Sequence, residues 1–168
     1  LGKFSDMKAQ LPPVQDWTPE LSGKIDIEIK KDCRWFHEGD EIKREKLVRI
    51  FSTILKREGD DYFLVTPVEK WQIDVEDVPF EIVLADIELN NGSPIIQFMT
   101  NTGDEIQLNT EHPLVFEGGS EVPKIEVRNG LLARLSRNVY YQLAEVAIDN
   151  KGVFEVKSAG GYFRLSAD

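Results

Sequence analysis

The chain has little of several things that mark particular protein classes. Its 168 residues include a single cysteine, Cys33, so neither an intramolecular disulfide nor a cysteine-based metal cluster can form. No apolar run approaches the roughly 20 residues that cross a bilayer, and we expect no membrane span. Basic residues are also scarce, because 20 Lys and Arg stand against 30 Asp and Glu, and the net charge of -10 repels a nucleic-acid backbone. These deficits predict a cytoplasmic protein that binds no nucleic acid.

Catalytic signatures are missing from the sequence as well. It contains no glycine-rich phosphate loop and no nucleophile elbow, and its two histidines, His37 and His112, lie far apart, each beside a glutamate. Two imidazoles with carboxylates could bind a divalent metal in a hydrolase, but neither histidine belongs to a helical ligand motif. We therefore predict no catalytic residue, no metal site and no cofactor, and the metal-dependent hydrolase is the least favoured hypothesis.

Hydrophobic periodicity predicts both strands and helices, and hence an α+β fold. Ile25, Ile27 and Ile29 alternate with charged residues, which is typical of a strand with one face in water. Apolar residues recur every three or four positions from Arg44 to about Glu58, which predicts an amphipathic helix, and a similar pattern follows Arg137. Four apolar segments between 80 and 116, separated by Asn-, Gly- and Pro-rich turns, predict an antiparallel meander.

One order of elements occurs twice along the chain. A hairpin, a helix and a second hairpin are expected from 24 to 65 and again from 124 to 156, which predicts an internal duplication with a ligand-sized cleft between the two halves. The proline-rich residues ahead of the first copy predict an extended arm anchored by Trp17. The expected domains are an arm at 1–19, an N-terminal α+β domain at 20–77, and a C-terminal domain at 78–168 that contains the second copy at about 123–166.

Five segments of the sequence form a recognisable set. They are Trp35-Phe-His-Glu-Gly ahead of Ile42 and Arg44, Tyr62-Phe-Leu-Val-Thr-Pro-Val-Glu-Lys, Val75-Glu-Asp-Val-Pro-Phe, Thr100-Asn-Thr-Gly-Asp, and Val127-Arg-Asn-Gly-Leu-Leu-Ala-Arg-Leu-Ser-Arg-Asn-Val-Tyr-Tyr. With them the chain, from about Trp17 to its end, resembles the proteobacterial family called domain of unknown function 1285. The resemblance implies a duplicated α+β core, a C-terminal half loosely like a pleckstrin-homology barrel, and a nucleotide-type ligand between the halves with a role in signalling.

Arginine gathers around the second copy. Arg128, Arg134 and Arg137 fall within ten positions, and Arg44 stands at the start of the first helix. A guanidinium group matches the oxygens of a phosphate or carboxylate, and a helix N-terminus adds N–H groups. We hypothesise that these arginines, assisted by Lys70 and Tyr141, bind a small anionic molecule, although ion pairs with neighbouring Asp and Glu would also explain them. Weaker candidates, which turn chemistry or packing would explain equally, are Thr66, Glu69, Asn101, Asp104 and Tyr140.

Two classes of function follow from these patterns. The favoured one is a signalling protein that binds a small anion, with a nucleotide-type ligand as one candidate, and passes the signal on through a protein partner. The second is an adaptor in which the pleckstrin-like half presents a strand edge or groove to a peptide without any small molecule. An exposed apolar groove without converging arginines would favour the adaptor.

Overall fold

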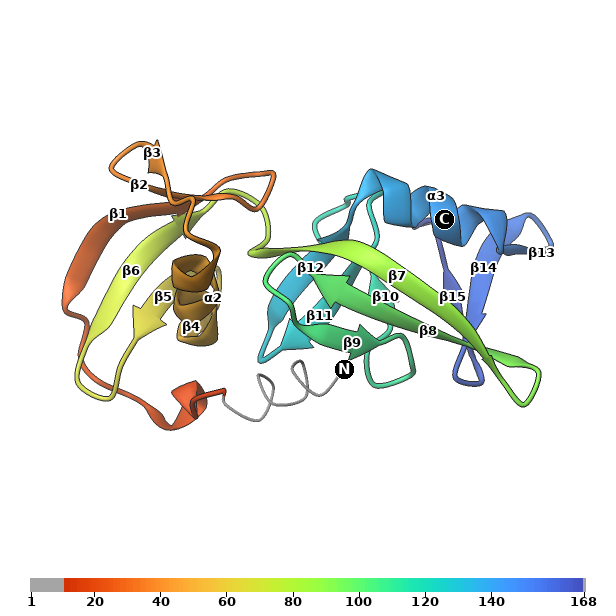
Figure 1. Ribbon diagram of the computed structural model, residues 1–168, viewed down its shortest axis with the longest axis horizontal. Coiled ribbons are helices and arrows are strands. Elements are labelled where there is room, and N and C mark those ends of the chain that lie inside the picture. Colours follow the sequence, from red (N-terminus) through yellow and green to blue (C-terminus); the bar gives the residue numbers. More distant parts are fainter. Residues whose placement is uncertain (1–10, 168) are drawn as a thin grey trace. The chain divides into compact units, whose positions relative to one another are not determined.

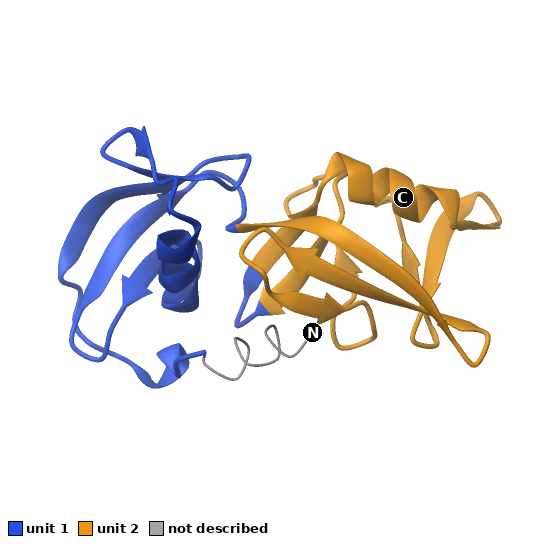
Figure 2. Ribbon diagram, viewed as in Figure 1, with its two compact units in different colours: residues 1–79, 128–131 blue, residues 80–127, 132–168 orange. Residues whose placement is uncertain are grey.

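The chain folds into two compact units, each built on one curled six-stranded sheet (Figures 1 and 2). The computed structural model describes residues 11–167. Unit 1 contains residues up to 79 together with 128–131, and unit 2 contains 80–127 and 132–168. Strands dominate the described residues, which also form two α-helices. The α+β prediction is therefore correct only in its coarse sense, that of a mostly β protein with two helices.

The sheet of unit 1 has a parallel pair at its centre. Its strand order is β3-β2-β1-β6-β5-β4, in which β1 and β6 run parallel and the other neighbours antiparallel. Ile27 and Ile29 of β1 are buried, and Phe51 of the helix stacks on the buried ring of Trp35 at 6.1 Å between centroids. The elements are β1 (Gly23–Ile29), β2 (Trp35–His37), β3 (Asp40–Glu41), α2 (Glu45–Thr53), β4 (Leu55–Glu58), β5 (Asp61–Val65) and β6 (Lys70–Val75).

Both helices are shorter than the periodicity predicts. The helix expected to reach about Glu58 ends at Thr53, and the next residues form β4, which pairs with β5. The second helix, α3 (Arg137–Glu145), is likewise followed by a strand, β13 (Ile148–Asn150). Hairpin pairing with the next strand along the chain, β5 after β4 and β14 (Val153–Ser158) after β13, overrides the helical period at both ends.

The described part of the N-terminal arm packs against the sheet of unit 1. Its short 3-10 helix, η1 (Val14–Asp16), places Val14 in a buried cluster with Phe63 and Val65, and Trp17 packs against this cluster. The Lys56 ammonium, itself buried, donates a 2.9 Å hydrogen bond to the carbonyl oxygen of Trp17. The anchoring role expected for Trp17 is confirmed, whereas residues 1–10 of the expected arm lie outside the described residues.

The sheet of unit 2 also has a parallel pair at its centre. Its order is β10-β11-β12-β7-β8-β9, in which β12 and β7 run parallel. The expected meander holds for β7, β8 and β9, but β10 leaves it and pairs with β11. Phe80, Ile82 and Phe98 lie in the buried core. The strands are β7 (Phe80–Asn90), β8 (Ser93–Thr100), β9 (Glu105–Gln107), β10 (Leu114–Val115), β11 (Lys124–Arg128) and β12 (Leu131–Leu135).

A tight turn joins β11 and β12, and its residues group with unit 1. Asn129 and Gly130 both have positive φ, 51° and 78°, as an Asn-Gly hairpin turn requires. The carbonyl oxygen of Gly130 accepts a 2.8 Å hydrogen bond from Arg57, and Arg128 donates one of 2.9 Å to the carbonyl oxygen of Ser52. Unit 1 is therefore made from two separate stretches of the chain.

A small second sheet completes unit 2. It contains β13, β14 (Val153–Ser158) and β15 (Gly161–Arg164), all antiparallel. The buried hydroxyl of Ser158 ties it to the large sheet, because its oxygen accepts a 2.9 Å hydrogen bond from the Ile96 N–H and donates one of 2.7 Å to the Leu108 carbonyl.

The duplication exists, but in a different alignment from the expected one. When the strands of each unit are numbered one to six along the chain, both sheets have the order 4-5-6-1-2-3 with the first and sixth strands parallel, so β1–β6 correspond to β7–β12. The expected repeat instead equated 24–65 with 124–156, and its second hairpin, β14–β15, belongs to the separate small sheet. Periodicity recovers the local order of elements but contains no information on which strands pair.

We predict that Ser158→Ala destabilises the protein by about 1–3 kcal/mol, because a buried N–H and a buried carbonyl both lose their hydrogen-bond partner. Urea unfolding followed by circular dichroism measures the change. Ser93→Ala is the matched control, since Ser93 is exposed on β8, and its effect should stay within about 0.5 kcal/mol. Equal effects of the two substitutions would contradict the role assigned to the Ser158 hydroxyl.

Candidate functional site

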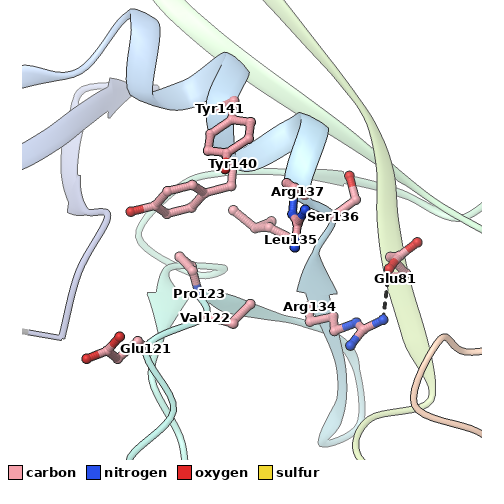
Figure 3. Close-up of a pocket in the computed structure, with 10 residues that line it drawn as sticks. All are labelled: Glu81, Glu121, Val122, Pro123, Arg134, Leu135, Ser136, Arg137, Tyr140 and Tyr141. Atoms are coloured by element: carbon pink, nitrogen blue, oxygen red, sulfur yellow. Dashed lines mark hydrogen bonds and ion pairs between the residues drawn. The ribbon is translucent and has the colours of Figure 1, made fainter.

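A pocket of about 540 Å³ lies in unit 2 where β12 ends and α3 begins (Figure 3). Four residues expected to bind a ligand line it: Arg134, Arg137, Tyr140 and Tyr141. Other polar lining groups come from Glu81, Glu121 and Ser136, and the apolar wall comes from Val122, Pro123 and Leu135. All of these residues belong to unit 2.

Ser136 sets the start of α3 and therefore the position of the pocket. It is the N-cap residue, with extended backbone, and its hydroxyl oxygen accepts a 3.2 Å hydrogen bond from the Val139 N–H. Its own N–H donates to the Ile82 carbonyl at 3.1 Å, which attaches the helix start to β7. The first turn of α3, where the helix dipole is positive, therefore has a fixed position at the pocket.

Arg134 is paired within the protein. It lies opposite Glu81 in the parallel register of β12 and β7, and its guanidinium donates a 3.1 Å hydrogen bond to the Glu81 carboxylate. Both side chains are mostly shielded, at 19% and 24% exposure. For this arginine the structural explanation that the sequence left open is correct.

Arg137 differs from Arg134. It is exposed at the first position of α3, and within residues 11–167 no carboxylate pairs with it. The Tyr140 and Tyr141 rings lie on the same helix, 6.2 Å apart and edge to face, and Tyr141 is 59% exposed. Figure 3 shows Arg137 and both rings projecting from the first two turns of α3. This arrangement offers a cation, a helix N-terminus and aromatic surface to one ligand.

The remaining cationic candidates belong to unit 1 and do not line this pocket. Arg44 is the exposed N-cap residue of α2. Arg128 donates to the Ser52 carbonyl, and the Lys70 ammonium pairs with Glu58 at 2.6 Å above the Phe63 ring. Arg128 and Lys70 thus both have structural contacts.

The weaker candidates in turns have turn roles. The Thr66 hydroxyl accepts hydrogen bonds from the N–H groups of Val68 and Glu69 at 3.3 and 2.9 Å. The Asp104 carboxylate accepts from the hydroxyls of Thr100 and Thr102. Asn101 fixes the backbone of Glu81, as its side-chain oxygen accepts from the Glu81 N–H at 3.1 Å while its own N–H donates to the Glu81 carbonyl at 2.9 Å. Asn101 therefore holds the main chain of Glu81, which lines the pocket.

The histidines lie in different units. His37 is exposed, with its Nε2 atom 4.0 Å from the Glu38 carboxylate, and the Nδ1 atom of His112 lies 2.9 Å from the Glu126 carbonyl oxygen. Over the described residues, no three His, Cys, Asp or Glu side chains gather as they would around a metal ion. No helix in the same part of the chain has the length and apolar character to span a membrane.

Sequence reasoning missed Glu81 and Ser136. Ser136 directly precedes a helical pattern, which is the ordinary N-cap signal and could have been used. Glu81 lies 53 positions from its partner Arg134, and only the parallel pairing of β12 with β7 brings the two together.

The fold and the pocket define a β-rich protein of two related units, one of which carries a pocket of small-molecule size. The family model described as domain of unknown function (DUF1285), N-terminal domain, matches residues 12–78, and the model of its C-terminal domain matches residues 79–165. The chain belongs to the DUF1285 family, which confirms the resemblance seen in the sequence.

Solved structures of the family are similar to the chain. A DUF1285 family protein from Silicibacter pomeroyi DSS-3 is 36% identical, with a TM-score of 0.84 over 93% of this chain and 87% of that one. Another, from Shewanella baltica OS155, is 27% identical, with a TM-score of 0.56 over 71% of this chain and 90% of that one. No curated protein matches the chain.

We predict that Ser136→Ala lowers the free energy of unfolding by about 1 kcal/mol, because the Val139 N–H loses its capping acceptor. Ser136→Asp should restore most of the stability, since a carboxylate also caps a helix and suits the positive end of its dipole. Chemical unfolding of the three proteins measures both effects. If the aspartate variant is as unstable as the alanine variant, Ser136 does not act as a cap.

Proposed function

We propose that the protein binds a small anionic ligand of the nucleotide type in the pocket at the start of α3. A volume of about 540 Å³ falls within the usual range for small-molecule sites. Arg137 and the first-turn N–H groups of α3 receive the anionic group, and Tyr140 and Tyr141 contact the planar part of the ligand. The pocket is built by unit 2 alone, so the proposal depends neither on a cleft between the halves nor on a pleckstrin-homology likeness.

The observation that carries the proposal is that Arg137 is exposed and pairs with no carboxylate of the described residues. In a chain with a net charge of -10, an arginine has many carboxylates available to it, yet within the described residues none pairs with Arg137. An exposed guanidinium beside a helix N-terminus and two aromatic rings is the combination that recognises phosphate joined to a ring.

A signalling role would use the contacts of α3. This helix packs against β7 of the large sheet and β14 of the small sheet, so a ligand at its first turn touches an element that contacts both. We propose that binding changes the surface which these elements present to a protein partner. The adaptor hypothesis has less support, because it calls for an apolar groove without arginines, whereas this pocket has two.

We predict that Arg137→Ala weakens ligand binding by about 10- to 100-fold, the usual loss when a charged hydrogen-bond partner is removed. The ligand is sought first by thermal shift against nucleoside mono-, di- and triphosphates and phosphorylated metabolites, and the affinity of each variant for it is then measured by calorimetry. Arg44→Ala is the matched control, since Arg44 is also an exposed arginine at the start of a nine-residue helix, and it should leave affinity unchanged.

Two results would count against the proposal. A panel that leaves the melting temperature unchanged would show that these ligands do not bind, because a ligand at a hundredfold excess over its dissociation constant adds about 2.7 kcal/mol of stability. Equal affinity in the wild type and Arg137→Ala would show that a ligand binds elsewhere.

A further inference from the structure

The pocket contains a carboxylate that competes with any anionic ligand. Resting on the proposed function, we infer that the Glu81 carboxylate occupies the edge of the Arg134 guanidinium that would otherwise bind an anion. The pocket therefore binds ligands with one phosphate or carboxylate group more tightly than it binds polyphosphates.

The Arg134–Glu81 pair is placed to resist displacement. The 3.1 Å contact joins side chains that are only 19% and 24% exposed, so water and salt screen it less than they screen a surface pair. An incoming phosphate that took Arg134 would leave the Glu81 carboxylate shielded and unpaired, which is costly. The ligand therefore finds Arg134 already satisfied.

Glu81 is also held in position by its backbone. Asn101 bonds both its N–H and its carbonyl, at 3.1 and 2.9 Å, and the β7 register sets it opposite Arg134. The main chain at Glu81 cannot move aside without breaking these contacts. Asn101 is thus a positioning residue for the carboxylate.

The balance of charge in the pocket leads to the same ligand class. Its charged lining groups are two arginines, Arg134 and Arg137, and two glutamates, Glu81 and Glu121, so the formal charges cancel. One phosphate can pair with Arg137 and the helix N-terminus. The further phosphates of a polyphosphate find Arg134 already paired and meet the Glu81 carboxylate, which is mostly shielded from solvent and therefore repels them more strongly than a surface carboxylate would.

The test compares AMP and ATP by calorimetry in metal-free buffer, using the full chain and its Glu81→Gln variant. We expect the wild type to bind AMP at least about tenfold more tightly than ATP, because repulsion falls on the additional phosphates. Glu81→Gln frees Arg134 and removes one negative charge, so it should strengthen ATP binding at least about fivefold and narrow the difference.

Glu121→Gln is the matched control. It removes a carboxylate that is exposed and therefore screened by water and salt, and it leaves the Arg134–Glu81 pair intact, so the AMP-to-ATP ratio should change less than about twofold. The double variant Glu81→Gln with Arg134→Gln should lose the gain in ATP affinity, since the freed cation is gone. Unfolding midpoints of all variants show that each is folded.

The outcomes separate the inference from the proposed function. If AMP and ATP bind the wild type equally, or if Glu81→Gln leaves their ratio unchanged, the inference is overturned while anion binding stands. If neither nucleotide binds the wild type or Glu81→Gln, nucleotide binding in this pocket is wrong and the inference falls with it.

Discussion

The parallel pairing of the first and last strands of each sheet is the constraint on which the rest of the structure depends. In unit 1 it joins β1 to β6 and in unit 2 it joins β7 to β12. It brings the two ends of a six-strand segment into the middle of the sheet, where they are most protected. A charged pair bridges the two strands in both units, Lys24 with Asp74 and Arg134 with Glu81. The Arg134–Glu81 pair also lines the pocket.

The pocket is not a feature that the two sheets share. Unit 1 has only Gly59 and Asp60 between its fourth and fifth strands, whereas unit 2 has a loop from 116 to 123 at that place, and this loop supplies Glu121, Val122 and Pro123. The helix α2 lies between the third and fourth strands of unit 1, but α3 follows the sixth strand of unit 2. The pocket therefore arises from what unit 2 adds to a common sheet, which is the pattern expected when a scaffold is repeated and one copy is specialised.

Local sequence patterns predicted many of the strands and helices, but they did not predict which distant strands pair. The alternation of Ile25, Ile27 and Ile29 predicted a strand. Of the residues expected at one site, those close together in the sequence line one pocket, namely Arg134, Arg137, Tyr140 and Tyr141, whereas Arg44, Lys70 and Arg128 belong to unit 1. The alignment of the repeat was missed, since a hairpin beside a helix looks the same whichever sheet it joins. Glu81 was missed for the same reason, as its role exists only through the β12–β7 register.

The Asn129-Gly130 turn affects the order in which the parts of the protein can fold. Arg57 and Ser52 of the N-terminal stretch find hydrogen-bond partners in Gly130 and Arg128, near the middle of the C-terminal family region. On the ribosome, all strands of the first sheet are synthesised by residue 75, but its full set of contacts must wait until residue 131 has been added. A fragment cut at the family boundary after residue 78 would be in the same incomplete state permanently.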